Sequence, residues 1–268
     1  MPGMLGDNMF KVPVAYQISK QLGVQVDVVV DEGSHCLCSL LNAQPWVNEA
    51  KPTHGVLGHP LGGQPWDFGR DAEWRAAYDQ VWHLGFRHFP GTNMIANTRD
   101  QCGFQFENPD AVVNERPILG EWKNCTKLAL AIESSYPPRA EQTLRTILPI
   151  RDQLAEMFDE VHLIAHAWGE GEYGQLLENP KYRLHKDEGD LNLTVNLLDE
   201  SLLVGTYSSM WAMAAACVKC PQVCIMDSGF FNPLRVTDPQ RELLAMVDDG
   251  PGILANVQHL IGMWRKTE

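Results

Sequence analysis

Short apolar segments that alternate with helix-like segments constrain the fold of this chain most strongly. In the second half such segments recur at 127–132, 160–166, 202–205 and 221–226. The residues between them are more polar and include stretches with apolar residues at helical spacing. Strands that are buried on both faces read as near-continuous apolar runs, and parallel strands need helical crossovers. The order therefore predicts an α/β fold with a parallel sheet.

The same order is present near the N-terminus. A glycine-rich stretch at residues 2–6 is followed by Asp7 and Asn8, which are good helix N-caps. Apolar residues then recur at helical spacing as far as Gly23, a natural C-terminal stop. The segment 24–30 reads as a buried strand. The sequence thus predicts a loop, a helix and a strand in α/β order.

The start of the chain departs from the usual pattern. A glycine-rich turn that leads into a helix normally follows a strand, because it carries the chain from the sheet into the crossover helix. Here only Met1 precedes Pro2. We expect either a chain start that is trimmed or a first sheet that lacks this strand.

Composition limits the classes of function. The chain of 268 residues carries a formal net charge of −13, which argues against a general nucleic-acid surface because such a surface needs Lys and Arg. No apolar run approaches the ~18 residues of a membrane span, and residues 1–10 lack the features of a signal peptide. The seven cysteines are expected to be reduced thiols. We therefore expect a soluble, cytoplasmic protein, with peripheral membrane association left open.

The length suits one large domain or two ordinary domains. Residues 108–125 contain Pro109, Pro117, Gly120 and several charges, which is typical of a linker. We place a boundary near Cys125. This gives an N-terminal α/β domain of residues 1–125 and a C-terminal α/β domain of residues 126–268.

Other elements are assigned from pattern alone. Residues 52–69 read as a loop rich in Gly, Pro and His, and 81–84 as a short strand. An amphipathic helix is expected over 143–158 despite Pro149, and 239–247 is expected to form a closing helix. Short helices are further expected at 97–103, 168–177, 210–217 and 253–264.

The segment from Gly169 to Gly174 matches the GxGxxG pattern and follows a predicted strand, as in dinucleotide-binding sites. However, Glu170 and Glu172 would place carboxylates where a pyrophosphate approaches. An ordinary strand-to-helix turn is therefore favoured. An NAD(P)-binding oxidoreductase remains the less favoured alternative.

Cysteines and histidines do not predict a metal site. Cys217 ends an apolar helix and Cys224 lies in a buried-looking strand, so both read as small core residues. Cys220 lies between them, and a zinc site would need such groups to meet in tetrahedral geometry. His162 and His166 are four residues apart but lie on a predicted strand, where this spacing is not one helical face.

A second anion-binding pattern lies at residues 203–216. A strand that contains Gly205 is followed by Ser208 and Ser209 and by a helix of small residues. Hydroxyls and free N–H groups at a helix N-terminus bind anions. The alternative is an ordinary capped core helix, because serine caps helices in many proteins.

Together these features resemble the GT-B glycosyltransferases, and within them the heptosyltransferase-like enzymes of lipopolysaccharide synthesis. Gly6-Asp7 followed by Pro13 is similar to the Gly-Asp turn and early helical proline of that family. The strand and acidic turn at 26–33 and the pair Tyr78-Asp79 match its next elements. In the second half, segments 134–139, 169–172 and 203–216 follow in family order.

The resemblance implies two Rossmann-like domains that face each other across a cleft, the first apparently without its first strand. It implies an inverting, metal-independent transfer of a sugar from a nucleotide-diphosphate donor to a hydroxyl acceptor. The C-terminal domain would bind the donor, and the N-terminal domain a glycan or lipid-linked glycan acceptor of polysaccharide biosynthesis. No cofactor is implied beyond the nucleotide sugar, which is a substrate.

The family's catalytic base maps onto Asp7, whose carboxylate would take the proton of the attacking hydroxyl, with Gly6 and Asn8 beside it in an acceptor-side loop. An N-cap is the alternative role of Asp7. The leaving diphosphate is stabilised by helix N-termini and cationic groups. Donor-phosphate contacts map onto Ser134, Ser135, Arg139, Ser208 and Ser209, although Arg139 is also readable as a solvated arginine.

One segment departs from the family pattern. The family has Asp-Ser/Thr-Gly followed by a histidine, whereas this chain reads TYSSMWAMA and places Met213 or Trp211 at the histidine position. A catalytically silent protein that binds a sugar or nucleotide with the same fold is therefore a second hypothesis.

Overall fold

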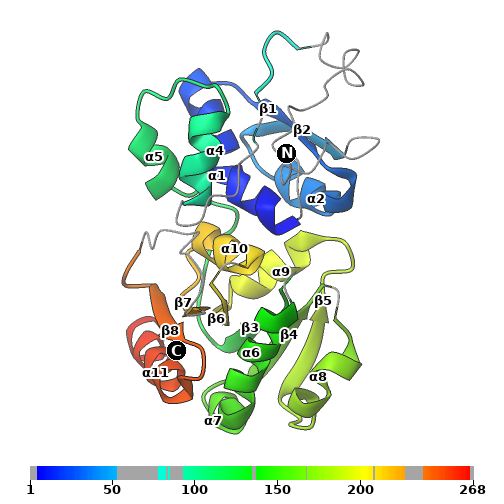
Figure 1. Cartoon of the computed structure of the whole chain (residues 1–268), viewed down its shortest axis with the longest axis vertical. Helices are drawn as coiled ribbons and strands as arrows, with labels where there is room; N and C mark the ends of the chain where they lie inside the picture. Colours follow the sequence, from blue (N-terminus) through cyan, green and yellow to red (C-terminus); the bar gives the residue numbers. More distant parts are fainter. Residues whose placement is uncertain are drawn as a thin grey trace. The chain divides into compact units, whose positions relative to one another are not determined.

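The computed structural model (Figure 1) describes residues 5–52, 78–82, 84, 93–134, 137–166, 168–207, 209–226 and 238–265, and the side chains from residue 8 onward. Its contacts divide the chain into two compact units. The N-terminal unit holds the described residues as far as Pro117, and the C-terminal unit holds those from Ile118 onward. The domain boundary near Cys125 stays a prediction.

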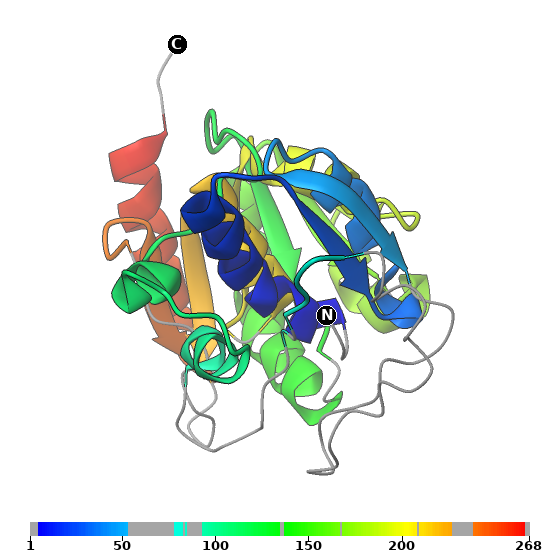
Figure 2. The same cartoon turned by 90° about the horizontal axis from the view of Figure 1, so that it is seen from above.

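The N-terminal unit combines a two-stranded parallel sheet with helices. Strands β1 and β2 lie side by side (Figure 2), and Val28 pairs with Ala50. Within the described residues, no strand pairs with the other edge of β1. The elements are α1 (Leu5–Leu22), β1 (Val26–Val30), the short 3-10 helix η1 (Glu32–Ser34), α2 (Leu37–Asn42), β2 (Val47–Pro52), α4 (Met94–Gln101) and α5 (Pro109–Asn114).

Helix α1 ends as predicted but begins earlier. Gly23 adopts a φ of +68° and donates its N–H to the carbonyl of Ser19, which is the usual glycine stop. At the other end the helix already includes Gly6, Asp7 and Asn8. Apolar side chains such as Met9 and Phe10 are buried in these first turns, so packing extends the helix past the predicted turn and N-cap.

The described residues of the predicted strand at 81–84 are not in a strand. Val81, Trp82 and Leu84 have no ladder partner, and residue 83 lies outside the described residues. The indole of Trp82 instead packs edge-on against Phe104, with ring centroids 5.3 Å apart. The predicted loop at 52–69 lies outside the described residues beyond Pro52.

The C-terminal unit is built on a six-stranded, fully parallel sheet with the order β5-β4-β3-β6-β7-β8. The strands are β3 (Lys127–Ala131), β4 (Glu160–Ala165), β5 (Tyr182–Lys186), β6 (Ser201–Thr206), β7 (Gln222–Met226) and β8 (Glu242–Met246). Four of them match apolar segments that the sequence predicts. The sheet confirms the predicted α/β class.

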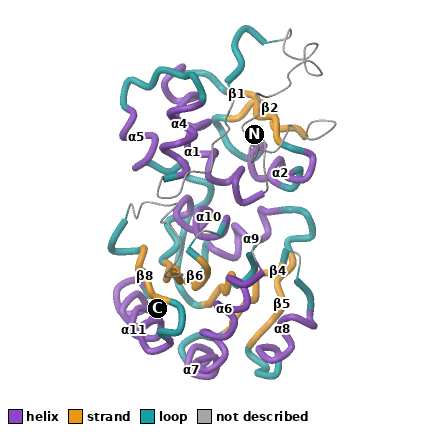
Figure 3. Tube along the Cα trace, in the orientation of Figure 1, coloured by secondary structure: helices purple, strands orange, loops and turns teal. Residues whose placement is uncertain are grey.

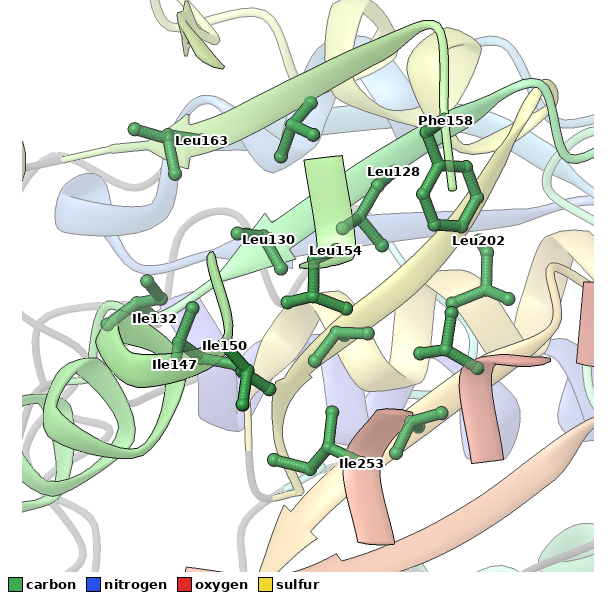
Figure 4. Packing of buried hydrophobic residues seen from close by; sticks show 14 of the residues in the cluster. Leu128, Leu130, Ile132, Ile147, Ile150, Leu154, Phe158, Leu163, Leu202 and Ile253 are labelled. Carbon is green, nitrogen blue, oxygen red and sulfur yellow. The ribbon is translucent and has the colours of Figure 1, made fainter. Parts of the chain in front are cut away.

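Helices cover both faces of this sheet (Figure 3). They are α6 (Pro137–Ile147), the 3-10 helix η4 (Leu148–Ile150), α7 (Arg151–Glu156), α8 (Glu170–Leu177), α9 (Leu191–Leu198), α10 (Met210–Val218) and α11 (Gly250–Trp264). Leu130 of β3 and Leu202 of β6 belong to a buried cluster that includes Ile147, Leu154 and Ile253 from the helices (Figure 4). This core joins the sheet to the helices on one of its faces.

Two predicted helices are corrected. The helix expected over 143–158 is broken, because Pro149 lacks an N–H and its ring crowds the preceding turn, so α6 and α7 are separated by η4. The segment 239–247 contains strand β8 rather than a helix, and Leu244 pairs with Cys224 of β7. Pairing with the sheet edge overrides the helical propensity of this segment.

Candidate active site

The strand order of the C-terminal unit reverses between β3 and β6. The chain runs from β3 outward through β4 to β5, then returns to β6 and continues through β7 to β8. In open parallel sheets, ligands bind at the carboxyl ends of the strands at such a switch point. The segments that leave β3 and β6 contain Ser134 and Ser209, two of the predicted donor contacts. The fold therefore brings together two segments that are far apart in the sequence.

Gly205 marks the close approach of these two strands. It pairs with Ala131 of β3, and a Cβ atom at position 205 would lie 2.6 Å from the Ala131 carbonyl oxygen. Real Cβ atoms do not approach backbone so closely. Glycine is thus required here for β3 and β6 to pair up to their carboxyl ends.

Helix α10 begins at the switch point. Its N-cap is Ser209, whose Oγ accepts the N–H of Ala212 at 3.1 Å. Ser209 therefore does act as a helix cap, which is the alternative role predicted for it. Because a hydroxyl both accepts and donates, its hydrogen can still bind an anion. Ser208 and Ser135, the other predicted hydroxyl contacts, lie outside the described residues.

Arg139 lies in the first turn of α6, directly after the segment that leaves β3. Its side chain is buried, with 9% of the residue exposed, which excludes a solvated surface arginine. Ser134 is half-buried in the segment before this helix. Because a guanidinium stays charged in proteins, Arg139 provides a fixed positive charge beside the switch point.

Two buried hydroxyls add to this polar edge. Within the described residues, Thr206 Oγ1 at the end of β6 and Thr143 Oγ1 of α6 have no hydrogen-bond partner. Thr143 lies one helical turn after Arg139. A buried hydroxyl without a partner costs about 1–3 kcal/mol. An ordered water or ion, a catalytic role or stored strain are the explanations for such groups.

The turn at Gly169 is an ordinary helix start. Glu172 Oε2 accepts the Gly169 N–H at 2.8 Å, and this bond lowers the pKa of Glu172. Glu133, which follows β3, accepts the N–H groups of His166 and Trp168. The backbone N–H groups of His166, Trp168 and Gly169 thus already donate to carboxylates. The geometry therefore favours a turn over a dinucleotide site.

A histidine–carboxylate pair lies at the same edge of the sheet. His166 directly follows β4 and Asp187 directly follows β5, and Nδ1 of the imidazole lies 2.6 Å from Oδ2 of the carboxylate. The pairing of Ala165 with Lys186 brings the two strand ends together. Sequence reasoning missed this pair, although a polar residue directly after a buried strand was a usable signal.

The predicted acceptor-side residues lie in α1 of the N-terminal unit. Asp7 belongs to the first turns of this helix, but its side chain lies outside the described ones. Asn8 is fully buried: Nδ2 donates to Ser34 Oγ at 2.8 Å and Oδ1 accepts Lys11 Nζ at 3.2 Å. Gly6 and Asn8 are thus helical rather than part of a loop, and Asn8 links α1 to η1.

The described cysteines and acidic groups form no metal site. No group of three His, Cys, Asp or Glu residues could hold a metal ion in the described part of the chain. None of the seven cysteines, all of which lie in the described part of the chain, forms a disulfide, and all but Cys38 are buried. Burial raises the pKa of Cys220 and Cys224, which keeps these thiols protonated and unreactive. They act as small core residues, as predicted.

Among the helices that the structure describes, none combines the length and apolar character that crossing a membrane requires.

Comparison with known proteins identifies the fold. No family model matches the chain, and no curated protein matches it in sequence. Solved structures match over nearly the whole length. E. coli ADP-heptose lps heptosyltransferase II is 16% identical with a TM-score of 0.63, and the match covers 98% of this chain and 97% of that protein. This chain has the heptosyltransferase fold.

Two further structures support the heptosyltransferase fold. E. coli heptosyltransferase WaaC, solved with ADP-2-deoxy-2-fluoro heptose, is 12% identical with a TM-score of 0.56, and the match covers 98% of this chain and 97% of WaaC. A family 9 glycosyl transferase from Veillonella parvula is 12% identical with a TM-score of 0.64, over 96% of this chain and 87% of that protein. The resemblance predicted from the sequence is thereby confirmed for the fold.

Proposed function

We propose that this protein transfers a sugar from a nucleotide-diphosphate donor to a hydroxyl acceptor. The observation that carries the proposal is the switch point between β3 and β6, where Arg139 is buried in the first turn of α6 and α10 begins at Ser209. A fixed guanidinium and a helix N-terminus are the groups that stabilise a leaving diphosphate. The fold is shared with a protein solved with a nucleotide sugar analogue.

The remaining chemistry follows the family pattern. Asp7 serves as the general base and accepts the proton of the attacking hydroxyl, and the transfer inverts the anomeric centre. The acceptor is a glycan or lipid-linked glycan, and no metal ion takes part. Ser134, Ser135, Ser208, Ser209 and Arg139 bind the donor.

Ligand binding tests the donor site directly. Thermal shift and calorimetry with ADP, GDP, UDP, CDP and NAD should reveal binding of at least one nucleoside diphosphate and none of NAD. Arg139→Lys should weaken that binding by about 10- to 100-fold, because lysine loses the planar fork of donors. Arg145→Ala is the matched control, since Arg145 is exposed on the same helix. Equal affinity of Arg139→Lys and wild type would refute the site.

Measurements of turnover test the proposed role of Asp7 as the general base. Asp7→Ala should abolish donor hydrolysis and transfer and leave nucleoside-diphosphate affinity unchanged, whereas Asp110→Ala, at an exposed position of α5, should retain activity. Unchanged turnover in Asp7→Ala would remove Asp7 from the mechanism. Activity should also persist in the presence of a chelator, as expected of a metal-independent transfer. NMR of the product should show an inverted anomeric centre.

A second candidate function is supported by α10. Met213 and Trp211, which stand at the position of the family histidine, are both buried in this helix. A chain without that histidine is also consistent with a binding protein that does not turn over. Donor binding without hydrolysis or transfer to any acceptor would favour this alternative.

A further inference from the structure

His166 is held at both its backbone and its side chain. Its N–H lies 3.1 Å from each carboxylate oxygen of Glu133, and Nδ1 lies 2.6 Å from Asp187 Oδ2. Glu133 belongs to the segment that leaves β3 and forms one side of the switch point. The imidazole is thus oriented on the same edge of the sheet as the proposed donor site.

The carboxylate determines which nitrogen carries the proton. The Asp187 side chain is 6% exposed, and its Oδ1 accepts the N–H of Gly189 at 3.0 Å. An ionised carboxylate only accepts hydrogen bonds, so Nδ1 of His166 is the protonated nitrogen. The neutral ring then presents a lone pair at Nε2. No described residue bonds to Nε2, and 37% of the His166 side chain is exposed.

The charge of the surroundings limits what this nitrogen binds. The segments and first helical turns that follow β3, β4 and β5 carry six carboxyl groups and, with the end of β5, two cations, Arg139 and Lys186. The carboxyl groups are those of Glu133, Glu170, Glu172, Asp187, Glu188 and Asp190. This excess of acids disfavours a phosphate next to His166. A hydroxyl is uncharged and donates to a lone pair. Sugar hydroxyls therefore match the site.

We infer that Nε2 of His166 binds a sugar hydroxyl of the donor, with Asp187 as its positioning residue. The inference rests on the proposed function, because it assigns part of the nucleotide sugar to this edge. The hydroxyl belongs either to the ribose of the nucleotide or to the sugar that is transferred. Both sources present the same chemistry, and deoxy analogues separate them.

Calorimetry on the full chain at about pH 8, where an ordinary imidazole is neutral, tests the inference. The ligands are the nucleoside diphosphate that binds wild type, its 2′-deoxy and 3′-deoxy forms, and the corresponding nucleotide sugar. His166→Phe should weaken binding about fivefold, the usual effect of one neutral hydrogen bond. For a ribose contact, one deoxy analogue shows the same loss in wild type and none in His166→Phe. For a contact with the transferred sugar, His166→Phe weakens binding of the nucleotide sugar and leaves binding of the nucleoside diphosphate unchanged.

The controls separate this inference from the proposed function. His259→Phe changes an exposed histidine of α11 and should bind every ligand as wild type does. Asp187→Asn keeps the imidazole and should show a smaller loss of affinity than His166→Phe. This variant provides the test if His166→Phe does not fold. If neither variant loses affinity while Arg139→Lys does, the inference is overturned and the donor site stands. If wild type binds no nucleoside diphosphate or nucleotide sugar, both are overturned.

Discussion

Replacing Gly205 by alanine is the sharpest test of how the switch point is built. A Cβ at this position would lie 2.6 Å from the carbonyl oxygen and 2.8 Å from the Cβ of Ala131. The nearest obstacle is backbone of the central strand β3, which cannot rotate away as a side chain can. Overpacking of this kind costs about 1–3 kcal/mol. We expect the upper half of that range, about 2–3 kcal/mol, because a strand has to shift.

The predicted effect is measurable as a lower unfolding midpoint. For a chain of this size, a loss of about 2–3 kcal/mol lowers Tm by roughly 4–12 °C. Thermal and urea unfolding followed by tryptophan fluorescence would report it. Gly171→Ala is the matched control, since a Cβ there meets nothing within 4 Å. Because position 171 is exposed, this change should stabilise helix α8 by about 0.5–1 kcal/mol.

A double variant separates the two contacts. Ala131→Gly removes the Cβ that would lie 2.8 Å away but leaves the carbonyl oxygen at 2.6 Å. Adding it to Gly205→Ala should therefore restore only part of the stability. The reasoning is refuted if Gly205→Ala unfolds within about 0.5 kcal/mol of wild type, the usual range for a surface substitution.

Two further predictions concern the C-terminal unit. The guanidinium of Arg241 lies 3.8 Å from the ring centroid of Trp264 and 5.2 Å from that of Trp122, so Arg241→Ala should cost about 1–2 kcal/mol in urea unfolding, and an unchanged midpoint would contradict a stabilising cation–π contact. Burial lowers the pKa of both His162 and His185, whose rings lie 6.1 Å apart, so both are neutral in the folded state near pH 7. The pKa values of these two histidines in the folded state lie below the unfolded value of about 6.5. The stability that they contribute as neutral groups is therefore fully present above about pH 6.5 and is lost as the pH falls. The unfolding free energy of wild type should drop between about pH 7 and 5, and more steeply than that of His162→Gln.

The sequence predicts the central strands better than the outer ones. Strands β3, β4, β6 and β7 lie inside the sheet, where both faces are covered, and so they read as continuous apolar runs. The outer strands β5 and β8 have a partner on one side only. They contain charged residues, YRLHK and ELLAM, and the sequence suggested no strand at either place. Edge strands commonly carry such polar residues, which hides their pattern.

Parts of the candidate site follow from local sequence, because a helix start or a glycine is visible within a few residues. The placement of Ser209 before α10, the burial of the cysteines and the stop at Gly23 are of this kind. They depend on hydrogen bonds and packing between near neighbours in the chain.

Only the tertiary structure decided which strand ends meet. Ser134 and Ser209 flank one switch point because β3 pairs with β6 after the chain has formed β4 and β5. His166 and Asp187 are 21 residues apart and meet because β4 pairs with β5. The chain alone predicts strands and helix starts, since these depend on local periodicity. The order of strands in the sheet depends on long-range packing, and that order assembles the site.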